Sequence, residues 1–173
     1  MPRHRRRQRR GLGTTLANPA LQQYCWQVLP TLGADGNLPP GEHGADWADI
    51  EHAFTSTPWR RYLLDGLRRA CAALAAAGCT RLWLDGSFVT DKELPADFDG
   101  CWDPAGVDPA LLDPVLLDFT ARRAAQKAKY GGELFPSTAP AGRHGRTFVQ
   151  FFQVDKHTGY AKGIVVLDPR SAP

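Results

Sequence analysis

The most constraining feature of the chain is an apolar segment that ends in a Gly-Ser pair. After nine intervening residues come two acids that flank one apolar residue. The apolar segment is Leu82–Asp85, the pair is Gly86-Ser87, and the acids are Asp97 and Asp99. Because side chains of a strand alternate between its faces, Asp97 and Asp99 would share one face. The segment therefore predicts two strands joined by a short connection, with two carboxylates beside a tight turn.

This arrangement indicates a site for a divalent metal and phosphate. Mg²⁺ takes one or two carboxylates and completes its coordination with water and substrate phosphates. Gly86 lets the backbone approach a ligand closely, and Ser87 offers a hydroxyl to phosphate oxygens. The alternative interpretation is an ordinary turn followed by an edge strand with solvated acids.

The segment from Leu84 to Asp99 resembles the signature of the nucleotidyltransferase superfamily, whose small members include the minimal nucleotidyltransferases. A longer string, 84–102 together with 126–136, is similar to a family of uncharacterised bacterial proteins usually placed in that superfamily. The resemblance covers roughly residues 30–168. It implies a Mg²⁺-dependent enzyme that transfers a nucleotide from a nucleoside triphosphate to a hydroxyl of a protein, an RNA or a small molecule.

The resemblance also implies roles for individual residues. Asp97 and Asp99 would be catalytic and hold Mg²⁺, while Gly86 and Ser87 would cradle the phosphates. A third carboxylate on a later strand usually completes such a site. Asp155 is the main candidate, although a hairpin turn would also favour an aspartate at this position.

Two lysines of a predicted helix, Lys127 and Lys129, are candidates to neutralise nucleotide phosphates. They fit a solvated helix face equally well.

Several functions stay open at this point. In small proteins the resemblance suggests a toxin–antitoxin or phage-defence module, with a partner protein or tRNA as acceptor. The alternative is a catalytically degenerate module that binds a nucleotide, a partner protein or nucleic acid, and the lack of a clear third acid favours it. A third hypothesis is a DNA-binding protein that uses the arginine-rich N-terminus together with a helix face formed by Arg60, Arg61, Arg68 and Arg69.

Charge is distributed unevenly along the 173 residues. The net charge is +3, but six of the 21 basic residues are arginines among the first ten positions, which leaves 15 basic against 18 acidic residues in the rest. Like-charged blocks are typically disordered, so residues 1–18 are predicted to be a disordered arm. The arm either contacts nucleic-acid phosphates or has no specific role.

Composition predicts a cytoplasmic globular protein. Hydrophobic residues make up 43% and charged residues 23% of the chain, which is ordinary for a soluble domain. We find no apolar run of the roughly 20 residues needed to span a membrane, and no secretory signal. The cysteines show no metal-ligand spacing.

The order of the expected elements predicts an α+β fold with a nucleotidyltransferase-like, small mixed or antiparallel sheet flanked by helices. Helices are expected at 19–29, 46–54, 58–77 and 121–130, and strands at 81–85, 97–102, 147–155 and 160–168. Residues 19–56 would be an extension that packs on a domain formed by 57–173. The helix at 58–77 should bury one apolar stripe and expose an arginine face, which contains Arg60, Arg61, Arg68 and Arg69.

Overall fold

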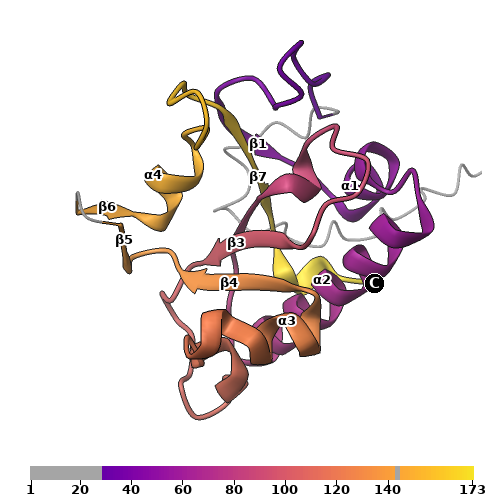
Figure 1. Cartoon of the computed structure of the whole chain (residues 1–173). Helices are drawn as coiled ribbons and strands as arrows, with labels where there is room; N and C mark the ends of the chain where they lie inside the picture. Colours follow the sequence, from indigo (N-terminus) through magenta and orange to yellow (C-terminus); the bar gives the residue numbers. More distant parts are fainter. Residues whose placement is uncertain (1–28, 143–144) are drawn as a thin grey trace, which may run out of the picture.

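The computed structural model describes residues 29–142 and 145–173 (Figure 1). The predicted arm at 1–18 and the predicted helix at 19–29, apart from Leu29, lie outside this part of the chain. Where the chain is described, none of the helices is long and apolar enough to cross a membrane.

The fold is α+β, as predicted, and is built on a mixed five-stranded sheet. The strands are β1 (Gly41–Gly44), β2 (Leu82–Asp85), β3 (Phe98–Trp102), β4 (Gly132–Pro136) and β7 (Gly163–Leu167). Their spatial order is β1-β7-β2-β3-β4. The two central pairings, β7 with β2 and β2 with β3, are antiparallel, whereas the outer pairings, β1 with β7 and β3 with β4, are parallel. A short antiparallel pair, β5 (Pro140–Ala141) and β6 (Arg146–Thr147), lies apart from the sheet.

Two of the predicted helices are confirmed together with the residues that begin them. The α-helices of the described residues are α1 (Trp47–Phe54), α2 (Pro58–Ala76), α3 (Ala124–Tyr130) and α4 (Phe148–Phe152). Asp46 caps α1 by accepting a hydrogen bond from the Asp49 amide. Thr57 caps α2, and Pro58 occupies its first turn, where a missing N–H costs nothing.

One face of the sheet packs on α1, α2 and α3 and forms the main core. The predicted stripe of α2 is buried there: Leu63, Leu67, Ala70, Cys71 and Leu74. Trp47, Ile50 and Phe54 of α1 belong to the same cluster. Residues 41–54 thus share the sheet, through β1, and the core, through α1, with the rest of the domain.

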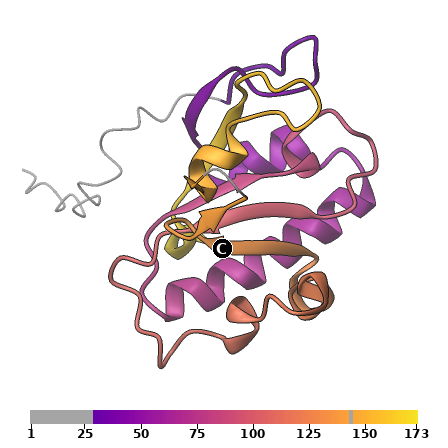
Figure 2. The same ribbon diagram turned by 60° about the vertical axis from the view of Figure 1, so that its left-hand side comes forward.

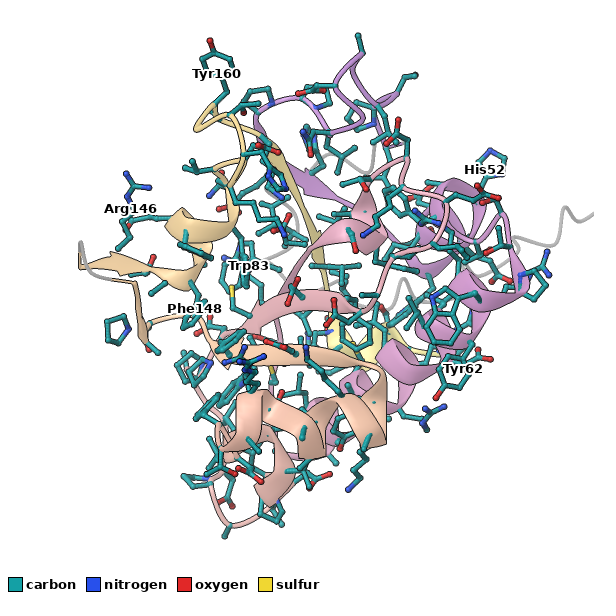
Figure 3. The ribbon with its side chains drawn as sticks, viewed as in Figure 1. His52, Tyr62, Trp83, Arg146, Phe148 and Tyr160 are labelled. Carbon is teal, nitrogen blue, oxygen red and sulfur yellow. The ribbon has the colours of Figure 1, made fainter. Side chains whose placement is uncertain are left out.

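The opposite face of the sheet carries a smaller apolar cluster that α4 covers. Figure 2 shows α2 and α4 separated by the sheet. Phe148 of α4 stacks on Phe135 of β4, with ring centroids 4.0 Å apart, and Figure 3 shows Trp83 on this same side of the molecule.

The predicted strand at 147–155 is wrong, because these residues contain α4. Thr147 and Gln150 form a capping box, in which each side chain accepts a hydrogen bond from the other residue's amide. This local signal begins a helix and overrides the β-propensity of the aromatic and branched residues. The turn after it, at 156–159, and part of the last predicted strand, now β7, are present.

The predicted helix at 121–130 begins later than expected, at Ala124. Ala121, Arg122 and Arg123 have φ values of 44°, 54° and 58°, a left-handed conformation that is unfavourable for residues with a side chain. The helix ends at Gly131 with φ 80°, as the glycine predicts. The chain then enters β4, a strand that the sequence patterns did not predict.

Close packing between α2 and α3 gives a first testable prediction. A Cβ atom at Gly66 would lie 1.8 Å from the backbone oxygen of Tyr130. Gly66→Ala is therefore expected to destabilise the protein by about 1–3 kcal/mol through overpacking, although alanine favours helix by about 1 kcal/mol. Urea unfolding measures the change. The matched control is Ala72→Gly on the exposed face of α2, and equal or higher stability of Gly66→Ala would contradict the close contact.

Candidate functional site

Three carboxylates stand side by side on one face of the sheet. Asp99 pairs in register with Asp85 of β2 and with Glu133 of β4, and directly opposed residues point to the same face. Asp97 precedes Asp99 by two residues and shares that face. We call Asp85, Asp97, Asp99 and Glu133 the acidic row.

The Gly-Ser turn lies directly against this row. Gly86 has φ 82°, a conformation that favours glycine, and a Cβ atom there would lie 2.6 Å from an Asp99 carboxylate oxygen. The sequence needs glycine at this position for both reasons. Ser87 follows at the start of a short 3₁₀ turn, Ser87–Val89.

Cations neutralise three of the four carboxylates. Lys162, just before β7, donates to Asp85 at 2.6 Å, and both side chains are largely buried. Lys127 of α3 bridges Asp97 at 3.0 Å and Glu133 at 2.5 Å. The Arg123 guanidinium forms a second ion pair with Glu133.

Asp99 differs from its neighbours in the row. Over residues 29–142 and 145–173, the structure gives its carboxylate no ion pair and no hydrogen-bond donor. Burial, followed by the negative charges of Asp97, Glu133 and Asp85, raises the pKa of Asp99 to about 7. A bound cation would offset both the desolvation of this carboxylate and the repulsion from its negatively charged neighbours.

A cavity of about 460 Å³ opens over Asp85, Asp97 and Asp99 and includes Gly86 and Ser87. The lining carries both signs of charge, and Asp35, Asp91 and Asp155 belong to it as well. The basic side chains that line the cavity are Lys92, Arg146, Lys156, His157 and Lys162. Phe151 and Phe152 of α4 supply an aromatic wall, and 44% of the Phe151 side chain is exposed. The cavity can therefore receive a ligand with both a polyanionic and a flat apolar part.

The Arg60 side chain holds the connection between β2 and β3 from outside the cavity. Arg60 of α2 is 3% exposed, so the prediction that it lies on a solvated face is wrong. Its guanidinium donates to four backbone oxygens, those of Phe54, Phe88, Thr90 and Lys92.

The other arginines of the predicted face differ from Arg60. Arg68 forms ion pairs with Glu51 and Asp65, and Arg61 and Arg69 are exposed.

The structure brings together most of the predicted site residues. Gly86, Ser87, Asp97, Asp99 and Asp155 all line the cavity. Lys127 contacts Asp97 from α3 rather than pointing into the cavity.

Lys129 is not part of this group. It forms an ion pair with Asp113, which also accepts a hydrogen bond from the Tyr130 hydroxyl.

Asp155 is a turn residue in this structure. Its carboxylate accepts hydrogen bonds from the amides of His157 and Thr158, both at 2.8 Å, and from the Asn37 side chain at 3.3 Å. These donors lower the pKa of Asp155 to about 2.

Sequence reasoning missed Glu133, Asp85 and Lys162. The signal for Glu133 is an acid between Gly132 and two apolar residues directly after a helix-ending glycine. A short apolar run between glycine and proline, such as Leu134-Phe135, is consistent with a short strand. For Asp85 and Lys162 no local signal exists, because their pairing joins residues 77 positions apart.

The donor set fits a hard cation such as Mg²⁺, which prefers oxygen ligands. Asp99 is the observation that supports the fit, since its carboxylate is largely buried and has no donor among the residues that the structure describes. Asp97 and Asp99 would hold the ion, with phosphate oxygens and water as further ligands. In the described part of the chain, no group of three or more His, Cys, Asp or Glu side chains is arranged to hold a metal ion.

Comparison with known proteins places the chain in a family without a described activity. No curated protein and no solved structure matches it. Residues 30–168 match a family model described as Family of unknown function (DUF6932), which spans the whole sheet, the acidic row and the cavity. By this match the chain belongs to the Family of unknown function (DUF6932).

Proposed function

We propose that the protein is a Mg²⁺-dependent nucleotidyltransferase that transfers a nucleotide from a nucleoside triphosphate to a hydroxyl of a protein, an RNA or a small molecule. The hydroxyl oxygen would form a bond to the α-phosphorus, and the bond from that phosphorus to the β-phosphate would break, with pyrophosphate as the leaving group. The observation that carries the proposal is Asp99, a carboxylate that lines the cavity beside Gly86 and Ser87 and has no ion-pair or hydrogen-bond partner within residues 29–142 and 145–173. The resemblance of residues 84–99 to the superfamily signature supports the same reaction class.

The cavity suggests how the chain would bind the nucleotide. Gly86 and Ser87 would face the phosphates, and Lys92, Lys156 and Arg146 of the lining would neutralise their outer charges. The exposed ring of Phe151 offers a surface on which a base can stack. Mg²⁺, held by Asp97 and Asp99, would neutralise phosphate charge and lower the pKa of the attacking hydroxyl.

Glu133, rather than Asp155, is the better candidate for a third carboxylate. It opposes Asp99 in register on β4, whereas the Asp155 carboxylate is occupied by turn amides. For Glu133 to contact a metal, it would have to release Lys127 or Arg123.

The same ion pairs favour a second candidate, a catalytically degenerate module that binds a nucleotide, a partner protein or nucleic acid without transfer. Two cations already neutralise Glu133, and a site with only two available carboxylates would bind a metal–nucleotide complex without completing the reaction. A role in a toxin–antitoxin or phage-defence module is compatible with either candidate, because both need an acceptor or a partner.

Titration calorimetry tests the proposal. We expect the wild-type protein to bind at least one of the four ribonucleoside triphosphates in the presence of Mg²⁺ and to bind at least tenfold more weakly in EDTA, a loss of about 1.4 kcal/mol or more. Asp97→Asn/Asp99→Asn should lose the metal-dependent part. The matched control is Glu93→Gln, which removes an exposed acid from the same connection between β2 and β3. Equal binding by the double variant would place the ligand elsewhere.

Transfer itself needs a separate measurement. Incubation with triphosphate labelled at the α-phosphate should label an acceptor in a cell extract, and the label should be absent with the double variant. Metal-dependent binding without transfer to protein, RNA or small molecules would favour the degenerate module.

A further inference from the structure

The first turn of α2 reaches across to the segment that follows the Gly-Ser turn. Three of the four oxygens that accept from the Arg60 guanidinium belong to this segment, at Phe88, Thr90 and Lys92, with distances of 2.8, 2.7 and 2.6 Å. The fourth oxygen belongs to Phe54, the last residue of α1, and lies 3.0 Å from the guanidinium nitrogen. A single buried side chain therefore ties the connection between β2 and β3 to both of the first two helices.

The neighbouring residue holds the other end of the same connection. The indole N–H of Trp59 donates to the backbone oxygen of Pro95 at 2.6 Å, two residues before Asp97. The backbone at Asp91 is fixed from a third direction, because its amide donates to the Gly36 oxygen. Residues 86–97 are thus held by contacts from outside the cavity, while several of them line it.

We propose that Arg60 is a positioning residue for the site: it fixes the segment 86–92 as the phosphate-facing wall of the cavity. The inference rests on the proposed function for the identity of the ligand, a metal–nucleoside triphosphate. The Arg60 side chain touches neither the cavity nor the acidic row and acts through the backbone that it holds.

The chemistry of the side chain explains why arginine is required. Guanidinium presents five N–H donors in a planar fork, and its charge persists at all physiological pH values. The Arg60 guanidinium contacts four carbonyl oxygens. The dipoles of these carbonyl groups stabilise its buried positive charge. Lysine has the same charge but concentrates its donors on one nitrogen at the end of a flexible chain. It cannot reach oxygens spread over residues 54 to 92 in the same geometry.

The consequence for binding is a matter of pre-organisation. A connection of this length would lose conformational entropy each time a ligand orders it. Holding Phe88, Thr90 and Lys92 in advance removes that cost from binding. A loosened segment should therefore weaken affinity for the ligand without changing the charge of the cavity.

Arg60→Lys in the full chain tests the proposal, with hydrogen exchange and calorimetry as two independent readouts. We expect the variant to remain folded and the amides of residues 88–92 to exchange about tenfold faster or more, since local opening becomes easier. Exchange in β7 should stay at the wild-type rate. The affinity for Mg²⁺ with the preferred triphosphate should fall about tenfold, because the ligand must then order the segment on binding.

Arg61→Lys is the matched control, because Arg61 is the next residue on the helix and is exposed. It should leave both readouts unchanged. If Arg60→Lys does not fold, Trp59→Phe replaces it, since Trp59 is 41% exposed and its indole N–H alone ties Pro95. Faster exchange at residues 96–97 and weaker binding are then expected.

The two failures can be told apart. Unchanged exchange at 88–92 in Arg60→Lys, or faster exchange with unchanged affinity, overturns the positioning role. Absence of any nucleotide binding by the wild type overturns the proposed function instead, and the exchange result still decides whether Arg60 holds the segment.

Discussion

Replacing Lys162 with methionine is expected to lower the free energy of unfolding by about 3–5 kcal/mol at pH 8, the scale found when one partner of a buried ion pair is removed. Lys162 donates to Asp85 at 2.6 Å, with side chains that are 11% and 5% exposed. The variant leaves a buried carboxylate without its partner, next to Asp99 on the same face. The effect should be the largest of any single substitution at the cavity that keeps the sheet residues intact.

The pH dependence of this loss identifies its cause. Burial already raises the pKa of Asp85, and removal of the lysine raises it further. As the pH falls, Asp85 in the variant takes up a proton and the carboxyl becomes neutral, so the loss should shrink towards pH 5.

Lys156→Met, at an exposed lysine that lines the same cavity, is the control and should change stability by less than about 0.5 kcal/mol. Urea unfolding at several pH values measures both variants. A loss for Lys162→Met that is the same at pH 5 and pH 8 would show that lost packing, not the unpaired charge, is responsible.

Local signals in the sequence predicted the parts of the fold that local interactions determine. Asp46 and Thr57 cap the helices that follow them, and the stripe of α2 faces the core. The segment after Thr147 shows the limit of propensity. Its residues favour strand, but the capping box with Gln150 and the packing of Phe148 on Phe135 make it a helix.

The candidate site was predictable only along its contiguous motif. Gly86, Ser87, Asp97 and Asp99 lie within fourteen residues of one another, so spacing alone could group them. Glu133 joins them through the pairing of β3 with β4, a contact between strands that no local pattern specifies. Sequence proximity likewise favoured Lys129 as strongly as Lys127, although only Lys127 reaches the acidic row.

The predicted exposure of the arginine face was wrong for Arg60, for a related reason. Periodicity placed Arg60 on the polar side of α2, where an arginine is normally solvated. Carbonyl oxygens of the connection between β2 and β3 bury it instead. Nucleic-acid binding by this face loses one of its four arginines, and Arg68 is committed to acidic partners.

Asp99→Asn is expected to stabilise the metal-free protein at pH 8 by roughly 1–3 kcal/mol, the pKa difference converted to energy and discounted for partial solvent contact. The pKa of Asp99 is raised from 3.8 to about 7 in the folded state. Its contribution to stability is therefore fully present below about pH 4 and is lost as the pH rises through about 7. Asparagine does not titrate, so the advantage of the variant should appear between these values and be absent at pH 4. Thermal or urea unfolding in EDTA across this range measures it.

The same substitution should abolish stabilisation by ligand. Mg²⁺ with the preferred triphosphate, added at about a hundred times its dissociation constant, should stabilise the wild type by about 2.7 kcal/mol, and it should leave Asp99→Asn unchanged. Glu93→Gln should behave as the wild type in both experiments. If Asp99 lowers the stability of the free protein but is needed for stabilisation by the ligand, its role is binding. At a purely structural position, asparagine would be favoured because it gives the more stable protein. If Asp99→Asn is no more stable than the wild type at pH 8, the carboxylate is solvated or paired in solution, and the main support for a metal–nucleotide site at this position is lost.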